Sequence, residues 1–157
     1  MKRYFLLLTL SFSVLLGFSQ KTQRQQMRDA EKVAISWLNK LNSKKYLDCW
    51  NMLGKTTQKQ TTFEDWNAYF SIELMPELGD FISRKYYLAE IEKEMEGLPK
   101  GLYVNIRYNS IYSNTDSAEE YVMMSLSKAG KWEILSYFAE YQLKDDNGEL
   151  PKSQLKN

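Results

Sequence analysis

Histidine, the side chain that most often moves protons at neutral pH, is absent from this 157-residue sequence, and cysteine occurs once, as Cys49. The missing imidazole excludes Ser-His-Asp and Cys-His catalysis and removes the commonest zinc ligand. Cys49 has no partner for a disulfide, and without a histidine neighbour it is expected to be a buried, inert thiol. The sequence also lacks a glycine-rich phosphate loop and a helical metal motif. It therefore predicts no cofactor, no metal site and no assigned catalytic residue.

Ser83-Arg84-Lys85 opens a β-type segment and supplies the clearest charged candidate for a binding site. The planar guanidinium of Arg84 carries five donors that match a carboxylate or another anion. The alternative is a solvated strand end, at which Arg84 pairs with a carboxylate of the chain such as Glu120 or Glu133. We favour this pairing, because ion pairs between surface side chains are common and contribute little.

Aromatic side chains are abundant, with 11 tyrosines, 7 phenylalanines and 4 tryptophans. Some of them could line a pocket between the helices and the sheet, since apolar pockets with a few polar tips are the usual sites for small ligands. The alternative, which we favour, is ordinary core, where a buried ring keeps its hydroxyl or indole N–H at the edge. With Arg84 included, the candidate binding residues are Trp66, Tyr69, Arg84, Tyr108 and Tyr137.

A histidine-free acid/base site would need a carboxyl group beside a tyrosine. The acidic residues gather instead in stretches that we expect to be exposed, such as Glu119-Glu120 and Asp145-Asp146. Mixed-sign runs usually form a solvated face. The sequence thus favours a non-enzymatic binding or interaction module, and the alternative is a small-ligand pocket or a histidine-free acid/base enzyme.

The first half of the chain carries the helical signals that would position these residues. Apolar residues from Ala30 to Leu41 recur at i, i+3, i+4 and i+7, which predicts a helix capped by Asp29. A short second helix follows, and residues 55–61 are expected to form a loop. A third helix is predicted from about Phe63 to Leu74, and Pro76 is expected to stop it.

The second half of the chain changes to the two-residue period of β-strands. Four strands are expected at about 83–93, 102–112, 119–128 and 132–141, with Gly, Asn, Ser and Pro between them. Helices first and strands last predict an α+β fold, with N-terminal helices packed on one face of a curved four-stranded antiparallel sheet. We expect Val33, Trp37, Val104, Ile106 and Ile134 to meet in its interior.

The N-terminus has the features of a cleavable leader. Lys2-Arg3 precedes an uncharged, leucine-rich run, Tyr4–Leu16, which is shorter than the ~20 residues that a membrane span needs. Small residues at Gly17 and Ser19 predict cleavage near Ser19-Gln20, and an uncleaved anchor helix is the alternative. Residues 1–19 are thus predicted to be a signal peptide, and the mature protein to be periplasmic or secreted with no stable membrane anchor. A flexible segment at 20–28, one domain at 29–142 and a disordered tail at 143–157 would follow.

Charge limits the partners that the mature chain can have. Without Lys2 and Arg3 the chain carries 19 basic and 20 acidic residues, with no basic block. Such a chain has no electrostatic footprint for nucleic acid or for an anionic membrane. The expected partner is therefore an unknown protein or small molecule. Aromatic residues on the open face of the sheet, such as Tyr103 and Tyr121, also suggest a homodimer through that face.

The order of elements resembles the cystatin-like and nuclear-transport-factor-2-like architectures. More closely, the chain resembles a family of exported bacterial proteins known as domain-of-unknown-function family 4019, over roughly residues 30–141. The markers are Ala34, Trp37-Leu38, Tyr46, Trp50, Trp66, Pro76, Leu78-Gly79, Ser83-Arg84-Lys85 and Gly130-Lys131-Trp132-Glu133-Ile134-Leu135-Ser136-Tyr137-Phe138. Ser136 departs from the glycine that the family often has there. The resemblance implies an exported α+β domain, and because the family has no established activity it implies no catalytic residue.

Overall fold

The computed structural model describes residues 22–144 as one helical layer followed by one sheet. The elements are α1 (Gln23–Asn42), α2 (Tyr46–Trp50), α3 (Lys55–Gln60), α4 (Phe63–Ala68), the π-helix η1 (Tyr69–Leu74), α5 (Met75–Leu78), β1 (Phe81–Glu92), β2 (Tyr103–Tyr112), β3 (Thr115–Leu126) and β4 (Trp132–Leu143). The strands form an antiparallel sheet in the order β1-β2-β3-β4. The predicted α+β fold class is confirmed. The predicted leader and residues 145–157 of the predicted tail lie outside the described residues.

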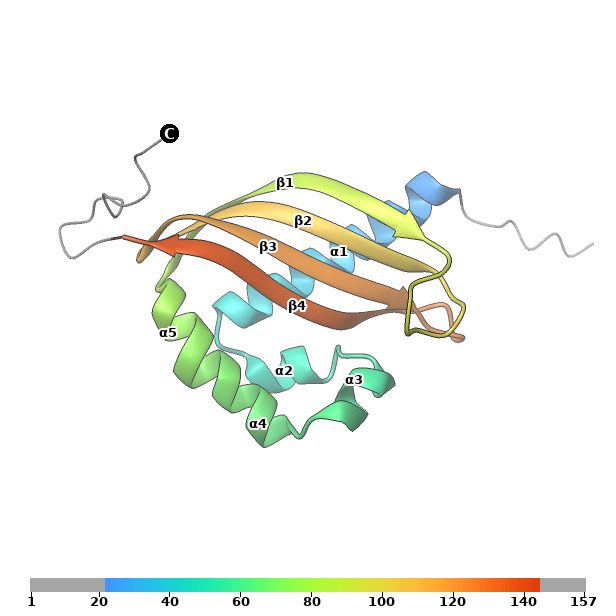
Figure 1. Cartoon of the computed structure of the whole chain (residues 1–157), viewed down its shortest axis with the longest axis horizontal. Helices are drawn as coiled ribbons and strands as arrows, with labels where there is room; N and C mark the ends of the chain where they lie inside the picture. The colour runs from blue at the N-terminus through green and yellow to red at the C-terminus, as the bar shows by residue number, and fades with distance from the viewer. Residues whose placement is uncertain (1–21, 145–157) are drawn as a thin grey trace, which may run out of the picture.

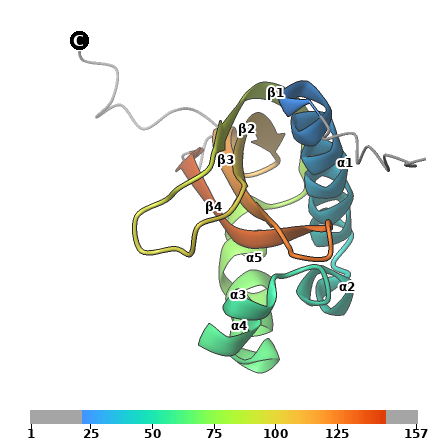
Figure 2. The same ribbon diagram turned by 90° about the vertical axis from the view of Figure 1, so that its right-hand side faces the viewer.

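The sheet curves around α1, which crosses one of its faces, while the shorter helices gather beside β4 (Figures 1 and 2). Trp37, Val104, Ile106 and Ile134 are fully buried in a single hydrophobic cluster, and Val33 packs against it from α1. The interior that the sequence predicted is therefore confirmed. It forms because the apolar stripe of α1 and the inward side chains of the strands bury each other.

The first helix begins earlier than its apolar pattern indicates. Thr22 forms a capping box, in which its Oγ1 accepts a hydrogen bond from the Gln25 backbone N–H at 3.3 Å and its own N–H donates to Gln25 Oε1 at 2.9 Å. Asp29 therefore lies inside α1, and the predicted cap at Asp29 is wrong, since residues 23–28 form the first turns of this helix. The added turns are polar, so hydrophobic periodicity could not find them.

The predicted stop at Pro76 is also wrong, because the helical segment that begins at Phe63 continues through η1 into α5 and ends before Gly79. The π-helix changes the bonding pattern ahead of the proline, and Pro76 then stands in the first turn of α5. A residue in the first turn needs no intrahelical partner for its N–H, which is the group that proline lacks. Pro76 therefore fits within this continuous segment.

The segment predicted as a loop at residues 55–61 instead forms α3. A helix this short is not stable alone, so its tertiary contacts hold it. Thr57 Oγ1 donates a hydrogen bond to the Leu135 carbonyl at 2.7 Å, and Gln58 Nε2 donates to the Trp50 carbonyl at 2.8 Å. These contacts lie beside an isolated parallel bridge between Leu53 and Ile134, which covers the start of the free edge of β4.

A β-bulge in β4 decides which of two neighbouring aromatic residues faces the core. Ile134 pairs with Met124 and Ser136 with Met123, so Leu135 is the extra residue. Beyond it the faces exchange, and Tyr137 turns inward while Phe138 is 45% exposed. Without the bulge, strict alternation from Ile134 would place Phe138 in the core and Tyr137 on the open face.

Gly79 joins α5 to β1 at a close approach to the β2–β3 turn. Its φ of +82° favours glycine, and a Cβ there would clash with Ser113 Oγ and lie 2.7 Å from Asn114 Cγ. These two side chains are not free to move away, because Ser113 Oγ accepts a hydrogen bond from the Asp80 N–H at 2.8 Å and Asn114 Nδ2 donates to the Pro76 carbonyl at 3.2 Å. The turn and the end of the helical layer are thus held together at Gly79.

Gly79→Ala is expected to lower the free energy of unfolding by about 1–2 kcal/mol more than Gly97→Ala does. Gly97 is a matched control, because its φ is +76° but a Cβ there meets nothing within 4 Å. The comparison separates backbone strain, which both variants share, from the clash with Ser113 and Asn114. Urea unfolding followed by tryptophan fluorescence measures both variants, and equal losses would contradict the close approach.

Candidate functional site

Arg84 and Glu120 form a buried ion pair on the side of the sheet that faces the helices. Arg84 Nε lies 2.6 Å from Glu120 Oε2 and its NH2 group lies 2.9 Å from Oε1, which is the two-pronged geometry that guanidinium and carboxylate favour. The side chains are 5% and 0% exposed. The predicted pairing of Arg84 with Glu120 is confirmed. The predictions of a solvated strand end and of an exposed Glu120 are wrong, because β1 and β3 turn these two side chains inward.

Three hydroxyl groups complete the shell around the Glu120 carboxylate. Ser110 Oγ donates a short hydrogen bond to Oε2, and the hydroxyls of Tyr112 and Tyr137 donate to Oε1 at 2.9 Å and 2.8 Å. The donors come from β1, β2 and β4, and the acceptor comes from β3, so every strand of the sheet contributes. A buried carboxylate needs such a shell to offset the loss of its hydration.

The pKa values of Arg84 and of two tyrosines in this cluster are raised. Burial alone would lower the pKa of Arg84, but the hydrogen bonds and negative charge of Glu120 outweigh it and raise that pKa. Burial, followed by the charge of Glu120, raises the pKa of Tyr112 and of Tyr137. Both phenols therefore remain protonated donors at neutral pH. The cluster has no free carboxylate position with which to take a proton from a substrate.

The aromatic candidates fill the space between helices and sheet. Trp66 lies 4.4 Å from Phe70 and 6.5 Å from Trp37 between ring centroids, and Trp37 lies 5.2 Å from Tyr137. Tyr69, 43% exposed, contacts the edge of this group through Phe70. These contacts have the edge and tilted geometries of a packed aromatic core.

The structure therefore brings four of the five candidate binding residues together through contacts with shared neighbours. Arg84 and Tyr137 share Glu120, Trp66 and Tyr137 share the aromatic cluster, and Tyr108 lies beside Arg84 with its ring 5.9 Å from the guanidinium carbon. The Tyr108 hydroxyl is buried without a hydrogen-bond partner among the described residues. Tyr69 is set apart at the surface. A binding role for these residues stays a prediction.

Cys49 is fully buried, as predicted. Its thiol donates to the Trp37 carbonyl at 3.6 Å, and the Trp37 indole N–H donates to the Cys49 carbonyl at 3.1 Å, which ties α1 to α2. Burial raises the pKa of Cys49 to about 12. Because the thiolate is the reactive form, this residue is an inert thiol at neutral pH.

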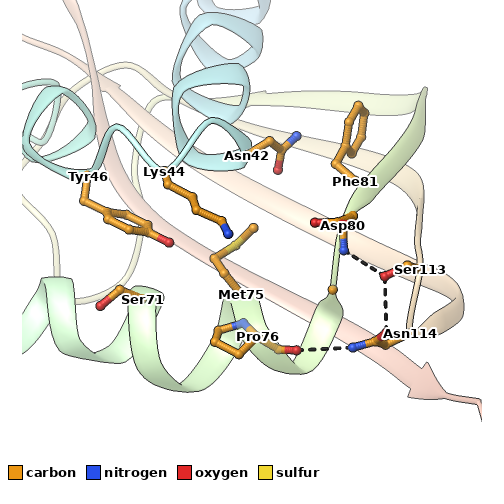
Figure 3. A pocket seen from close by; sticks show the side chains of 11 residues that line it. Asn42, Lys44, Tyr46, Ser71, Met75, Pro76, Asp80, Phe81, Ser113 and Asn114 are labelled. Carbon is orange, nitrogen blue, oxygen red and sulfur yellow. Dashed lines mark hydrogen bonds between the residues drawn. The ribbon is translucent and has the colours of Figure 1, made fainter.

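A cleft of about 520 Å³ opens where the turn after α1 meets η1, α5 and the β2–β3 turn (Figure 3). Its lining residues are Asn42, Lys44, Tyr46, Ser71, Met75, Pro76, Gly79, Asp80, Phe81, Ser113 and Asn114. The buried ion pair lies next to it, since the Arg84 guanidinium stacks 4.7 Å from the centre of the Phe81 ring. Asn42 connects the two sites, because its Oδ1 lies 3.3 Å from the Tyr112 hydroxyl.

Two features of the cleft wall are unusual for a simple surface depression. Asn42 Nδ2 is buried without a hydrogen-bond partner among the described residues, which is a costly state for a donor. Lys44 has a φ of +58° in the turn that ends α1, where its N–H donates to the Leu41 carbonyl and the Lys45 N–H donates to the Lys40 carbonyl, both at 2.9 Å. This helix-ending motif favours glycine, and lysine costs about 1 kcal/mol there.

The sequence did not predict the cleft, because its walls come from turns that lie far apart along the chain. The only local pattern that marked part of the cleft wall was Leu78-Gly79, where a helix ends and a strand follows. Within residues 22–144, no group of acidic or cysteine side chains could hold a metal ion, and no helix is long and apolar enough to cross a membrane.

Of the two aromatic residues named for the predicted homodimer, Tyr121 lies on the open face of the sheet, whereas Tyr103 is buried and its hydroxyl donates a short hydrogen bond to the Pro99 carbonyl. Tyr121 stacks on Phe138 with ring centroids 4.3 Å apart, and Arg107 lies over Tyr121 while pairing with Glu90 at 3.3 Å. Tyr137, in contrast, faces the interior. Self-association through this face stays a prediction.

These features define an α+β domain with a closed polar cluster in its interior and an open cleft at the junction of helices and sheet. Residues 33–137 match the family model described as "Protein of unknown function (DUF4019)". The chain belongs to this family. No curated protein and no solved structure matches it.

Glu120→Gln is expected to lower the free energy of unfolding by about 3 kcal/mol, because it leaves the Arg84 charge buried without a counter-charge. Glu119→Gln is the matched control on the opposite face, where the carboxylate is 34% exposed and lies 3.7 Å from Arg107. That change is expected to cost about 0.5 kcal/mol or less. Urea unfolding measures both, and equal losses would show that Glu120 is not a structural counter-ion.

Proposed function

We propose that this chain is an exported, non-enzymatic binding module whose ligand site is the cleft between α1, α5 and the β2–β3 turn. The observation that carries the proposal is the contrast between the interior and the cleft. Inside, both carboxylate oxygens of Glu120 accept hydrogen bonds from Arg84 and from hydroxyl groups of the protein. The cleft has a volume of about 520 Å³, within the ~300–1,000 Å³ typical of small-ligand sites, and exposed polar side chains such as Lys44 and Asp80 are part of its lining.

The same contrast argues against a histidine-free acid/base enzyme. Such an enzyme needs a carboxyl group whose oxygen can reach the substrate. The Glu120 side chain is fully buried, and both of its oxygens accept hydrogen bonds from Arg84 and from hydroxyl groups. A role in holding the fold accounts for this arrangement without any reaction.

Export is supported by the leader-like residues that precede the described domain. A short positive region, an apolar run and small residues before Gln20 form the pattern of a signal peptide. The inert Cys49 suits an oxidising compartment, since it has no partner with which to form a disulfide. Periplasmic or secreted protein would then meet its ligand outside the cytoplasm.

Native mass spectrometry of protein recovered from the periplasm or medium of a host that exports it tests the ligand site. We expect a non-covalently bound small molecule on the wild type. Ser71→Trp, which fills the cleft, is expected to lose this molecule, whereas Ser83→Trp on the exposed part of β1 should keep it. A wild-type protein without bound mass, or equal retention by both variants, would contradict a ligand site in the cleft.

The mass of the exported protein tests the leader. We expect a mature chain that begins at Gln20 in the periplasmic or extracellular fraction. Ser19→Tyr places a bulky side chain at the position that signal peptidase requires to be small, and it is expected to leave uncleaved precursor in the membrane fraction. A wild-type chain that keeps residues 1–19 and stays in the cytoplasm would contradict export.

A further inference from the structure

The cleft presents one positive and one negative side chain that do not neutralise each other. Lys44 reaches it from the turn after α1, and Asp80 reaches it from the residue that precedes β1 (Figure 3). Within residues 22–144, neither side chain forms an ion pair or a side-chain hydrogen bond, in contrast to Lys40 with Asp48 and Arg107 with Glu90. Two opposite charges are thus held apart across a cavity large enough for a small molecule.

The backbone positions both charged residues independently of their side chains. The turn at Lys44 favours glycine, so the lysine side chain is not needed to form it. Asp80 is fixed by two hydrogen bonds to the β2–β3 turn, in which its N–H donates to Ser113 Oγ and its carbonyl accepts from the Ser113 N–H, both at 2.8 Å. The two charged groups are therefore free to contact a ligand, and each can be removed without removing the wall that carries it.

Apolar and neutral groups fill the space between the charges. Met75, Pro76 and Phe81 contribute hydrocarbon surface, and Figure 3 shows the Lys44 side chain extending above Met75. Tyr46 supplies a hydroxyl beside Lys44, and burial, followed by the charge of Cys49, raises the pKa of Tyr46. This phenol is thus a protonated donor at neutral pH that can accompany Lys44 in binding a carboxylate.

We propose that the cleft binds a small zwitterion of the aliphatic amino-acid class, with its carboxylate at Lys44, its amino group at Asp80 and its hydrocarbon part on Met75, Pro76 and Phe81. A simple anion would leave Asp80 unpaired and close to a like charge, and a simple cation would do the same at Lys44. A ligand that carries both charges can pair with Lys44 and Asp80 at the same time. This inference rests on the proposed function of the cleft.

The test uses the mature chain at low ionic strength with four probes of similar size: norleucine, 6-aminohexanoate, hexanoate and hexylamine. Titrations followed by backbone amide NMR report both the affinity and the residues that shift. We expect at least one of the two zwitterions to bind about fivefold more tightly than either singly charged probe, with shifts at Lys44, Asp80 and Ser113. Singly charged probes that bind as tightly as both zwitterions would overturn the inference.

Variants assign each end of the ligand. Lys44→Gly keeps the turn and removes the ammonium, and it is expected to weaken binding of the zwitterion and hexanoate about fivefold while leaving hexylamine unchanged. Asp80→Asn is expected to weaken the zwitterion and hexylamine while leaving hexanoate unchanged. Lys45→Gln, next to Lys44 but outside the cleft lining, is the control and should change none of the affinities. Equal losses of hexanoate and zwitterion affinity in Lys44→Gly and Lys45→Gln would also overturn the inference, since both variants lower the net charge by one and the losses would report net charge alone.

The two proposals fail in different ways. If a bound molecule is lost in Ser71→Trp but no zwitterionic probe shifts the cleft amides, the cleft is a ligand site and its assignment to amino acids is wrong. If neither experiment places a molecule in the cleft, the proposed function fails together with this inference.

Discussion

The rest of the structure depends on the ion pair between Arg84 and Glu120. A guanidinium and a carboxylate can be buried together only if their remaining donors and acceptors are also satisfied. Here the carboxylate receives hydrogen bonds from side chains on each of the other three strands. A shift of β3 by one residue would turn Glu120 to the open face and leave Arg84 buried alone, so the pair strongly favours one register of the sheet.

This constraint also shapes what the protein can do. The residues whose types suggest chemistry, a carboxylate beside two tyrosines and an arginine, are held by one another and closed to solvent. The hydrogen bond that joins Tyr112 to Asn42 passes from this closed cluster to the wall of the cleft. The cluster therefore supports one wall of the cleft, where turns at the junction of helices and sheet carry the side chains of Lys44 and Asp80 without ion-pair partners among residues 22–144.

Much of the fold could be predicted from local pattern. The apolar stripe around Trp37, the alternation at Val104 and Ile106, and the glycine-rich breaks identified the first helix, the strands and their order. The pairing of Arg84 with Glu120 was also among the predictions, but its burial was not, since a run of charged residues reads as a solvated face. The start of α1 and the helical course through Pro76 were missed because each depends on hydrogen bonds rather than on hydrophobic period.

The sequence by itself determined the fold class, the leader-like N-terminus, the inert character of Cys49 and the absence of histidine chemistry, because these follow from composition and short-range periodicity. Tertiary structure alone decided that Tyr137 rather than Phe138 faces the core, since a bulge at Leu135 exchanges the faces of β4. It also decided that Lys44 and Asp80 face a common cleft, because packing brings together turns that lie 36 residues apart along the chain. No local pattern encodes such a meeting, and the candidate site depends on it.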